Sequence, residues 1–477
     1  MAVRRLVARV PLDELAPTFA EIRRRHEVAE VYPRDALADV DAARAANAHG
    51  GELAHVDGER ADRTDLELVT IDPEGSRDLD QALAVEATDA GWLVHYAIAD
   101  VGAHVTPGGA LDRDTWSRVE TVYCPDKRVG LHPPQLSEGF ASLLPGQRTK
   151  AVLWSLEVAS DGALGAARVE RAWVTSRRQY SYDELRLAPP DEAKSLVDVM
   201  RTLGDARREY VRAGGGVTLP KPSQEVDVDN GQLTLEFRAA TGIEDDNAQI
   251  SLLTGEAAAR MMLEAGVGVL RTMPPAQPED IERLRRQALA IGVEWPHGAS
   301  YGEVLDALDP ATPKAAAFLT QATRLFRGAA WEPFDGQALP VPEHTTHGAL
   351  ARPYAHVTAP LRRLVDRYGT EVCLAHTSGR AVPEWVLAAL PRLGETMMAG
   401  VRVGSAIDRE CVDAVEAAVL KPHVGETFTA VGLDDRTIQL ENPAVVATCA
   451  GEVKVGERQR VRLVTADAGK AEFQTVT

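Results

Sequence analysis

The stretch that decides how this chain is interpreted is Ile71-Asp-Pro-Glu-Gly-Ser-Arg-Asp-Leu-Asp-Gln81. The apolar run over residues 66–71 predicts a β-strand that ends where Asp72 begins the polar part of the stretch. Pro73 and Gly75 suit positions i+1 and i+3 of a type I turn that has Asp72 at position i. We therefore expect the chain to leave a strand at Asp72 and to turn back at once.

Such a turn can bring Asp72 beside Asp78 and Asp80, which share one side if their own segment is extended. Three crowded carboxylates repel one another unless a cation neutralises them, and oxygen ligands at this density suit Mg²⁺ or Mn²⁺. The same array suits phosphodiester hydrolysis, in which bound metal activates water and stabilises the leaving oxygen. The alternative is a solvated turn whose aspartates cap backbone N–H groups, which is the commoner case for an isolated motif.

Further sequence blocks along the chain help to decide between a metal site and a solvated turn. They are Ile98-Ala-Asp-Val101, Pro107-Gly-Gly-Ala-Leu-Asp112, Thr121-Val-Tyr-Cys-Pro125, Leu131-His-Pro-Pro-Gln-Leu-Ser137, Ser142-Leu-Leu-Pro-Gly146 and Tyr354-Ala-His-Val-Thr-Ala-Pro-Leu-Arg-Arg-Leu-Val-Asp366. With the aspartate stretch, they resemble the ribonuclease II (RNB) family over roughly residues 66–400. The resemblance implies a processive, Mg²⁺-dependent 3′-to-5′ exoribonuclease, with Mn²⁺ as a second candidate metal. Its implied partner is single-stranded RNA, which it degrades to nucleoside 5′-monophosphates.

The resemblance also assigns roles within the aspartate stretch. The family signature has four aspartates, of which the first three fall on Asp72, Asp78 and Asp80, and these three are the predicted catalytic carboxylates. The fourth falls on Gln81, which keeps a carbonyl oxygen but has no charge. We predict that all four residues are metal ligands, with a changed metal preference or weaker affinity because of Gln81. One alternative is a non-catalytic RNA-binding regulator that retains the fold, and another is an acidic phosphatase unrelated to RNA.

A pair of arginines completes the predicted catalytic site. Arg362 matches the family's catalytic arginine, and Arg363, which flanks it, is a predicted RNA contact. From the residues alone, Thr358 suits a helix N-cap and Pro360 suits the first helical turn. A phosphate there would meet a helix N-terminus and a guanidinium group able to stabilise developing charge. The alternative is an ordinary surface pair of arginines at the start of a helix.

Two tyrosines are predicted to contact RNA bases. By the resemblance, Tyr123 stacks on a base near the far end of the bound strand and Tyr182 lies near the 3′-terminal nucleotide. Stacking on an aromatic ring tolerates any base, as a processive nuclease requires. The alternative for each is a core tyrosine with a satisfied hydroxyl group. The carboxylate that selects ribose falls near residues 243–249, where the best register gives Gln249 and leaves residues 244–246 a few positions away.

Composition restricts the remaining possibilities. The chain has 477 residues and a formal net charge of −19, so an acidic metabolic enzyme is favoured on charge alone, although local patches and bound cations can reverse the local field. Its four cysteines are far apart with no C-x-x-C pair, which argues against a zinc site or disulfide framework. It has neither a signal-peptide core nor a run of about 18 apolar residues. We expect a monomeric cytoplasmic protein with no membrane contact.

The chain is expected to be an α+β protein with appended modules. Residues 1–65 suggest a small helical or winged-helix domain, with Arg4, Arg5 and Arg23–Arg25 as candidate phosphate contacts. Residues 66–410 mix short strands with helices and show no clear linker, so we predict one large RNB catalytic domain.

The C-terminal segment, residues 421–477, changes to five short apolar strands separated by turns. Five strands in so short a segment predict a small β-barrel, with the OB fold as the candidate, and the segment resembles the S1-like RNA-binding module of the family. Arg458, Arg460 and Arg462 alternate along one expected strand, so their side chains share a face while Val461 and Leu463 face the core. We predict that this arginine face contacts RNA; the alternative is a solvated strand face.

Overall fold

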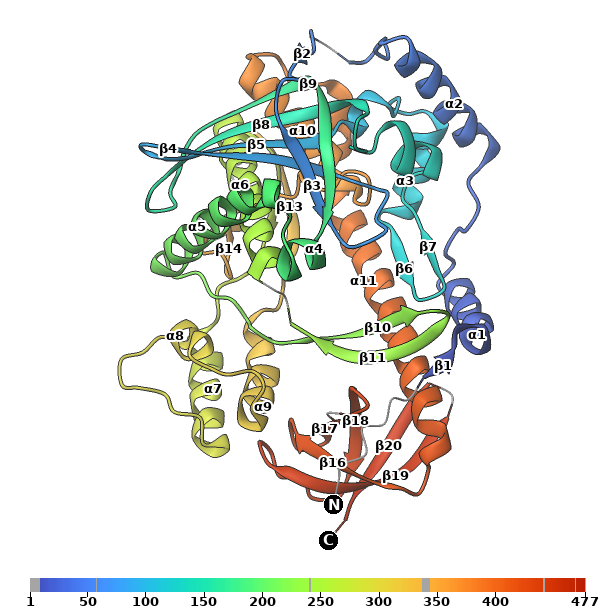
Figure 1. Cartoon of the computed structure of the whole chain (residues 1–477), viewed down its shortest axis with the longest axis vertical. Helices are drawn as coiled ribbons and strands as arrows, with labels where there is room; N and C mark the ends of the chain where they lie inside the picture. Colours follow the sequence, from blue (N-terminus) through green and yellow to red (C-terminus); the bar gives the residue numbers. More distant parts are fainter. Residues whose placement is uncertain are drawn as a thin grey trace.

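The computed structural model describes residues 9–56, 58–239, 242–336, 344–440, 442–467 and 469–476. Its largest sheet has six strands in the order β2-β9-β3-β4-β5-β8, and β9 also pairs with β8 (Figure 1). The sheet therefore folds round on itself. Its strands are β2 (Ala61–Asp62), β3 (Leu68–Asp72), β4 (Gln81–Thr88), β5 (Gly91–Ala99), β8 (Arg148–Ala159) and β9 (Leu164–Ser181).

The long strand β9 positions the end of β3. Its first part runs antiparallel to β8 and its last part runs parallel to β3, with Asp72 opposite Ser181. Parallel neighbours end at the same edge of a sheet, so Asp72 lies next to the residues that follow β9. Those residues form α4 (Tyr182–Leu187), which begins at Tyr182. The topology thus brings Asp72 and Tyr182 to one edge although they are far apart in the sequence.

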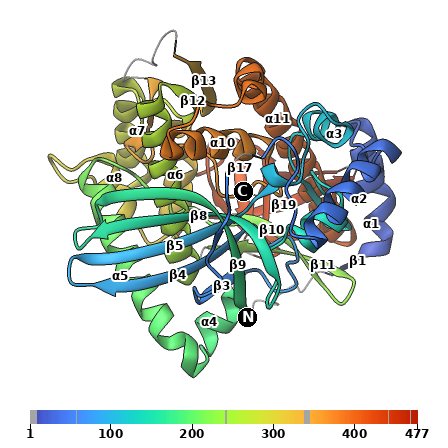
Figure 2. The ribbon, with the colours of Figure 1, turned by 90° about the horizontal axis from the view of Figure 1, so that it is seen from above.

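Helices α6 (Gly242–Ala265) and α10 (Leu364–Ser378) pack against this sheet and against each other (Figure 2). Helix α6 is buried on most of its circumference, and Ile250, Leu253 and Met262 are fully buried. Such extensive burial places α6 in the interior of the domain. Helix α5 (Asp191–Ala213) packs along α6 and is amphipathic instead. The main core therefore lies between the sheet and these helices.

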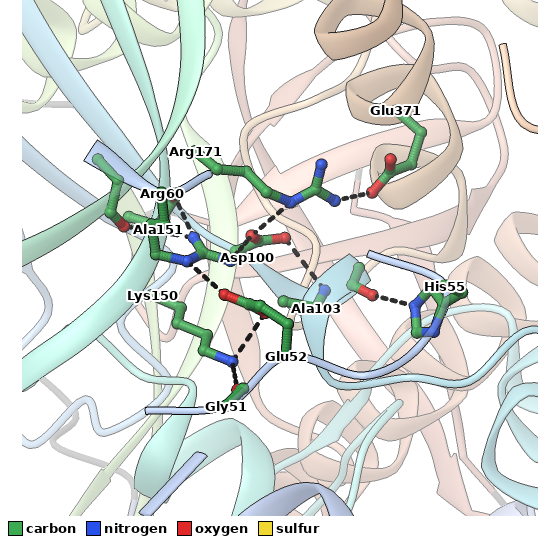
Figure 3. Close-up of polar contacts among 12 residues, drawn as sticks. Gly51, Glu52, His55, Arg60, Asp100, Ala103, Lys150, Ala151, Arg171 and Glu371 are labelled. Carbon is green, nitrogen blue, oxygen red and sulfur yellow. Dashed lines mark hydrogen bonds and ion pairs between the residues drawn. The ribbon is translucent and has the colours of Figure 1, made fainter. Parts of the chain in front are cut away.

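A buried network of charged side chains ties α10 to the sheet (Figure 3). Asp100 accepts hydrogen bonds from Arg60 (2.8 Å) and Arg171 (3.1 Å), and Arg171 also pairs with Glu371 on α10. Burial opposes ionisation of Asp100, but the two arginines outweigh it and hold the pKa of Asp100 below its usual range. A buried charge without a partner is costly, so this pairing constrains α10, and with it the segment that precedes the helix.

The N-terminal segment is helical, as predicted, with α1 (Leu12–Arg25) and α2 (Arg34–Ala48). Helix α1 packs on α11 and α2 packs on α3 (Ala110–Arg118). A winged helix also needs a β-hairpin, and the described part of residues 1–65 contains none of its own. Its two short strands pair elsewhere: β1 (Val10–Pro11) with β11 (Gln232–Arg238), and β2 with β9.

The hypothesis of a phosphate contact at Arg23 is wrong. The Arg23 side chain is 4% exposed, and it donates to Asp126 (2.6 Å) and Glu30 (2.7 Å) in an ion pair that fixes α1. Arg24 and Arg25 are more exposed, and each pairs with a glutamate. Two further predicted contacts lie outside the described residues: Arg4 and Arg5.

Helix α11 (Glu384–Leu420) connects the large domain to the C-terminal barrel (Figure 1). At 1.5 Å per residue its 37 residues span about 55 Å. The barrel is closed in the order β16-β17-β18-β20-β19, around a core that includes Phe428, Leu440 and Phe473. The predicted five-stranded barrel is therefore confirmed. Its strands are β16 (Thr427–Gly432), β17 (Thr437–Leu440), β18 (Val445–Ala450), β19 (Arg458–Asp467) and β20 (Lys470–Thr475).

Smaller elements surround these two bodies. The hairpin β6 (Val122–Cys124) and β7 (Lys127–Val129) contacts α11, and β10 (Ser223–Asp229) pairs with β11. A group of helices packs beside the barrel: α7 (Pro278–Ile291), α8 (Tyr301–Asp306) and α9 (Pro313–Ala322). Strands β12 (Val267–Thr272) and β13 (Ala330–Asp335) form a ribbon along α11. Within the described residues, none of the helices combines the length and apolarity needed to cross a membrane.

Candidate active site

Asp72 is the last residue of β3, where the sequence places it, but the turn that follows is displaced by one residue. The Ser76 N–H donates to the Pro73 carbonyl oxygen (3.2 Å), so the turn begins at Pro73 instead of at Asp72. Gly75 occupies its third position with φ of +80°, which a type II turn requires. The predicted type I turn is therefore wrong in type and register, although the chain still turns back toward Asp78.

Asp80 is buried immediately before β4 and is held at one oxygen. Its Oδ1 accepts a hydrogen bond from the Leu361 N–H (2.7 Å), and its Oδ2 lies 3.8 Å from Arg362 Nε. Burial raises the pKa of Asp80 to about 8, although Arg362 and the Leu361 N–H oppose the shift. The segment that carries the predicted catalytic arginine is thus bonded directly to the most buried of the three aspartates.

The three aspartates and Arg362 share one site. Burial, and then the charge of Asp78, raises the pKa of Asp72 to about 7. The charge of Asp78 also raises the pKa of Asp80, while Arg362 lowers the pKa of both Asp72 and Asp80. Such effects require the charges to be close. The structure therefore brings together the residues that the sequence proposed, and their catalytic roles stay predictions.

Asp78 has a partner that the sequence did not suggest. Arg128, in β7, donates through Nη1 to Asp78 Oδ1 and through Nη2 to Glu138 Oε1. Burial alone would lower the pKa of Arg128, but Asp78 and Glu138 outweigh burial and raise it. In the sequence, Lys127-Arg128 has the character of an ordinary solvated turn, so nothing there pointed to Arg128 as a site residue. The partnership depends on the position of the hairpin.

Gln81, a predicted metal ligand, uses both ends of its amide within the protein. Its Nε2 donates to the Thr358 carbonyl oxygen (2.6 Å), and its Oε1 accepts from the hydroxyl of the buried Tyr96 (2.7 Å). The Thr358 hydroxyl in turn bonds to Ser251 of α6 (2.9 Å). Gln81 thus joins β4 and β5 to the segment before Arg362, and its role as a metal ligand stays a prediction.

The predicted start of the helix after Thr358 is wrong. Helix α10 begins at Leu364 with Arg363 as its N-cap, and Thr358 and Pro360 lie in the irregular segment before it. Arg362 keeps 46% of its side chain exposed, so its guanidinium is accessible beside the aspartates. Arg363 instead donates to Asp366 (2.8 and 3.0 Å) and is 17% exposed. Its role as an RNA contact stays a prediction, and its guanidinium already has a partner.

The two tyrosines lie on either side of the cluster. Tyr123 is 51% exposed in β6; burial of its hydroxyl, and then the charge of Asp78, raises its pKa, whereas Arg362 lowers it. Tyr182 is more buried; its hydroxyl accepts a hydrogen bond from Asn247 Nδ2 of α6 (2.9 Å). Tyr123 therefore has the exposure expected of a stacking residue, whereas Tyr182 presents a more fixed ring. Their contacts with RNA stay predictions.

The region proposed for ribose selection is occupied by ion pairs. Glu244 pairs with Arg238, and Asp246 pairs with Arg208 (2.8 Å). Gln249, the position in the best register, lies half-buried in α6. Two of the three neighbouring carboxylates, Glu244 and Asp246, are therefore engaged in ion pairs.

The arginine face of the barrel has the predicted geometry. Arg458, Arg460 and Arg462 are exposed along β19, whereas Val461 and Leu463 are buried in the barrel core. The alternation expected from the sequence is confirmed. RNA contact by this face stays a prediction.

The carboxylates of the site fit a metal ion in part. Within the part of the chain that the structure describes, no group of three or more His, Cys, Asp or Glu side chains is already arranged to hold a metal. Asp72, which is partly buried, and Asp80, which is buried, nevertheless suit a hard divalent cation, because a neighbouring cation would lower their raised pKa values. Arg128 occupies Oδ1 of Asp78, so a cation at that oxygen would displace the guanidinium. The chemistry of the site fits a divalent cation held mainly through Asp72 and Asp80.

Comparison with known proteins identifies the large domain. The model of the RNB domain matches residues 60–372. The chain belongs to the RNB family. The model of the RNase II-type exonuclease C-terminal S1 domain matches residues 426–475, which are the barrel. The predicted fold class, an α+β RNB domain followed by an S1-like barrel, is therefore confirmed.

Curated relatives with similar sequences are bacterial ribonucleases. Ribonuclease R of Escherichia coli is 29% identical over 331 residues, which cover 64% of this chain and 39% of that protein. Exoribonuclease 2 of Photorhabdus laumondii is 27% identical over 397 residues, which cover 79% of this chain and 59% of that protein. The chain thus spans between about two fifths and three fifths of the length of these relatives.

Solved structures share the fold at low sequence identity. RNase R of Mycoplasma genitalium in complex with ribose methylated single-stranded RNA superposes with a TM-score of 0.82 at 17% identity, covering 96% of this chain and 78% of that one. Yeast Ssd1, which is described as a pseudonuclease, has a TM-score of 0.64 at 16% identity, covering 82% of this chain and 50% of that one. The fold therefore occurs in a protein described as having lost nuclease activity as well as in ribonucleases.

Proposed function

We propose that this chain is a Mg²⁺-dependent 3′-to-5′ exoribonuclease that degrades single-stranded RNA processively to nucleoside 5′-monophosphates. The observation that carries the proposal is the meeting of Asp72, Asp78, Asp80 and Arg362 at one sheet edge in a member of the RNB family. Mn²⁺ is the second candidate metal, since it shares the preference of Mg²⁺ for oxygen ligands.

Each carboxylate has a separable task. The Leu361 N–H holds Asp80 Oδ1, which leaves Oδ2 for a cation or for Arg362. Asp72 supplies a second carboxylate from the end of β3, and the two together would hold the metal. When bound, the metal supplies an activated water and stabilises charge on the leaving oxygen. The exposed Arg362 guanidinium then stabilises the negative charge that develops on the scissile phosphate.

The RNA strand is held by residues on two bodies of the molecule. Tyr182, fixed by Asn247, orients the 3′-terminal nucleotide, and the exposed Tyr123 stacks on a base further along the strand. The arginine face of β19 binds the phosphate backbone before it reaches the catalytic domain. Contacts at several points keep the strand bound between successive cleavages, which supports processive action.

A specific observation favours a second candidate, a non-catalytic RNA-binding protein that retains the fold. Gln81 lacks the charge of the fourth signature aspartate, and both ends of its amide are bonded within the protein. The cluster therefore offers at most three carboxylates for a metal, and Arg128 occupies one of them. Under this alternative the chain would bind single-stranded RNA and release no mononucleotides.

One degradation assay separates the two candidates. A uniformly labelled single-stranded RNA, a duplex with a 3′ overhang and a DNA of the same sequence are incubated with the chain and Mg²⁺ or EDTA. We expect Mg²⁺-dependent release of nucleoside 5′-monophosphates from the single-stranded RNA, with little release from DNA. Excess unlabelled RNA added after the start should leave the products of the first binding event unchanged if degradation is processive.

A matched pair of variants tests the site itself. Asp80→Asn keeps an oxygen that can accept the Leu361 N–H, so the fold is retained while the charge is lost. It should abolish hydrolysis and leave RNA binding within about twofold. The control is Asp161→Asn, which alters an exposed aspartate that also accepts a backbone N–H (2.9 Å, from Ala163). Normal turnover by Asp80→Asn would refute the assignment.

A further inference from the structure

The three carboxylates of the cluster are not equally in need of a cation. Asp78 is paired with Arg128, whereas the Asp72 carboxylate has no hydrogen bond within the described residues and Asp80 has only a backbone N–H and a more distant Arg362. Neither Asp72 nor Asp80 therefore has a close cationic side chain as its partner. The cluster therefore contains one carboxylate that the protein neutralises itself and two that it does not.

Arg128 is held in place from two directions. It lies opposite Tyr123 in the β6–β7 hairpin, and opposite residues of an antiparallel pair project to the same face. At its far end Glu138, in the helical segment Leu136–Phe140, binds the second guanidinium nitrogen. The guanidinium thus bridges two carboxylates, and its planar fork suits that geometry. It is a fixed part of the site instead of a solvated side chain.

The surroundings also provide space for Arg128 to move. Asp78, Arg128, Glu138 and Leu361 line a cavity of about 160 Å³ that extends toward Tyr32. The Arg128 side chain is 29% exposed, so it can leave Asp78 without unfolding the hairpin. A cation that bound Oδ1 of Asp78 would displace the guanidinium into this space.

We propose that Arg128 is an internal counter-cation that competes with the divalent metal for Asp78 and so weakens metal binding at this site. The proposal rests on the proposed function, because it concerns the same carboxylates. Together with the engaged Gln81 amide, it leaves Asp72 and Asp80 as the principal ligands. Arg128 is then a positioning residue that determines how many carboxylates a cation meets, and removing it should convert Asp78 into a ligand.

The test measures Mn²⁺ binding without RNA and without turnover. Free Mn²⁺ is followed by electron paramagnetic resonance as it is titrated into the full chain. Arg128→Gln should bind Mn²⁺ about tenfold more tightly, which corresponds to about 1.4 kcal/mol. The matched control is Arg201→Gln, which removes an equal charge from an exposed ion pair with Asp198 and should change affinity less than twofold. Equal affinity in Arg128→Gln and the unchanged chain would overturn the proposal.

A second variant chain distinguishes the displacement of Arg128 from Asp78 from a general change in charge. In a chain that already carries Asp78→Asn, the Arg128→Gln change should yield less than a twofold gain, because no carboxylate is released. The same tenfold gain in both backgrounds would show that only long-range charge is involved, and would overturn the proposal. Far-UV circular dichroism checks that each variant is folded.

The outcome is distinguishable from failure of the proposed function. Mn²⁺ binding that tightens in Arg128→Gln, in a chain that hydrolyses no RNA, would support the inference and refute the exoribonuclease. Conversely, RNA hydrolysis by the unchanged chain with no response of Mn²⁺ affinity to Arg128→Gln would support the exoribonuclease and overturn the inference.

Discussion

Between pH 6 and pH 9 the metal-free chain should lose stability, because two carboxyl groups of the active site with raised pKa values must give up their protons. In the folded chain the pKa of Asp72 is about 7 and that of Asp80 about 8, whereas an aspartate in an unfolded chain titrates near ~3.9. At pH 6 both groups are therefore mainly protonated when folded and ionised when unfolded. This stabilisation is fully present below about pH 4 and is lost as the pH rises through 7 and 8.

The magnitude follows from the shifts. The stabilisation from Asp72 is lost over about one pH unit, from pH 6 to the pKa of about 7. The stabilisation from Asp80 is lost over about two pH units, from pH 6 to the pKa of about 8. At about 1.36 kcal/mol per unit, the free energy of unfolding should fall by at most about 4 kcal/mol. With an unfolding entropy of about 2.1 cal/mol/K per residue, a chain of this length that unfolds as one unit should lose about 4 °C in Tm.

The assay is thermal unfolding in EDTA at pH 6 and pH 9, for the unchanged chain and for the double variant Asp72→Asn with Asp80→Asn. The variant cannot titrate at these positions, so the difference between the two pH dependences isolates them from other buried acids such as Glu416. Mg²⁺ should raise the Tm more at pH 9 than at pH 6, since it binds the ionised carboxylates. The same loss of Tm in both chains would refute the reasoning.

Three further outcomes are expected. Arg362→Lys keeps the charge but loses the planar guanidinium, and should lower kcat on single-stranded RNA by about 10²-fold with RNA binding nearly unchanged, as separate cleavage and filter-binding measurements would show. Gln81→Glu turns a donor to the Thr358 carbonyl into an acceptor, and should cost about 1–3 kcal/mol in urea unfolding; an unchanged midpoint would contradict the bridging role. Arg460→Gln combined with Arg462→Gln should reduce the slope of log affinity against log salt by about 1.4 for single-stranded RNA, and an unchanged slope would remove the barrel face from the interface.

Much of the fold was predictable because it depends on local patterns. The C-terminal strands alternate apolar and polar residues, so their number and the exposure of Arg460 followed from period two alone. Helix α7 begins at Pro278 and ends before Gly292, the residues that favour such ends. The turn after Asp72 and the start of α10 were mispredicted, because in both places bonds to distant parts of the chain outweigh local preference. Leu361, for example, gives its N–H to Asp80 instead of to a helix cap.

By itself, the sequence determined which chemical groups this protein could use: three closely spaced aspartates, an arginine block and a strand with alternating arginines. These features depend on residue type and spacing, and the resemblance to a family rests on them. Only the tertiary structure decided how the charges are paired, because Arg128 and Leu361 reach the aspartates from separate elements. Burial raises the pKa values of Asp72 and Asp80, and burial is a property of the packed chain. The aspartates are thus specified locally, whereas their charge state and their free oxygens are set by residues far away in the sequence.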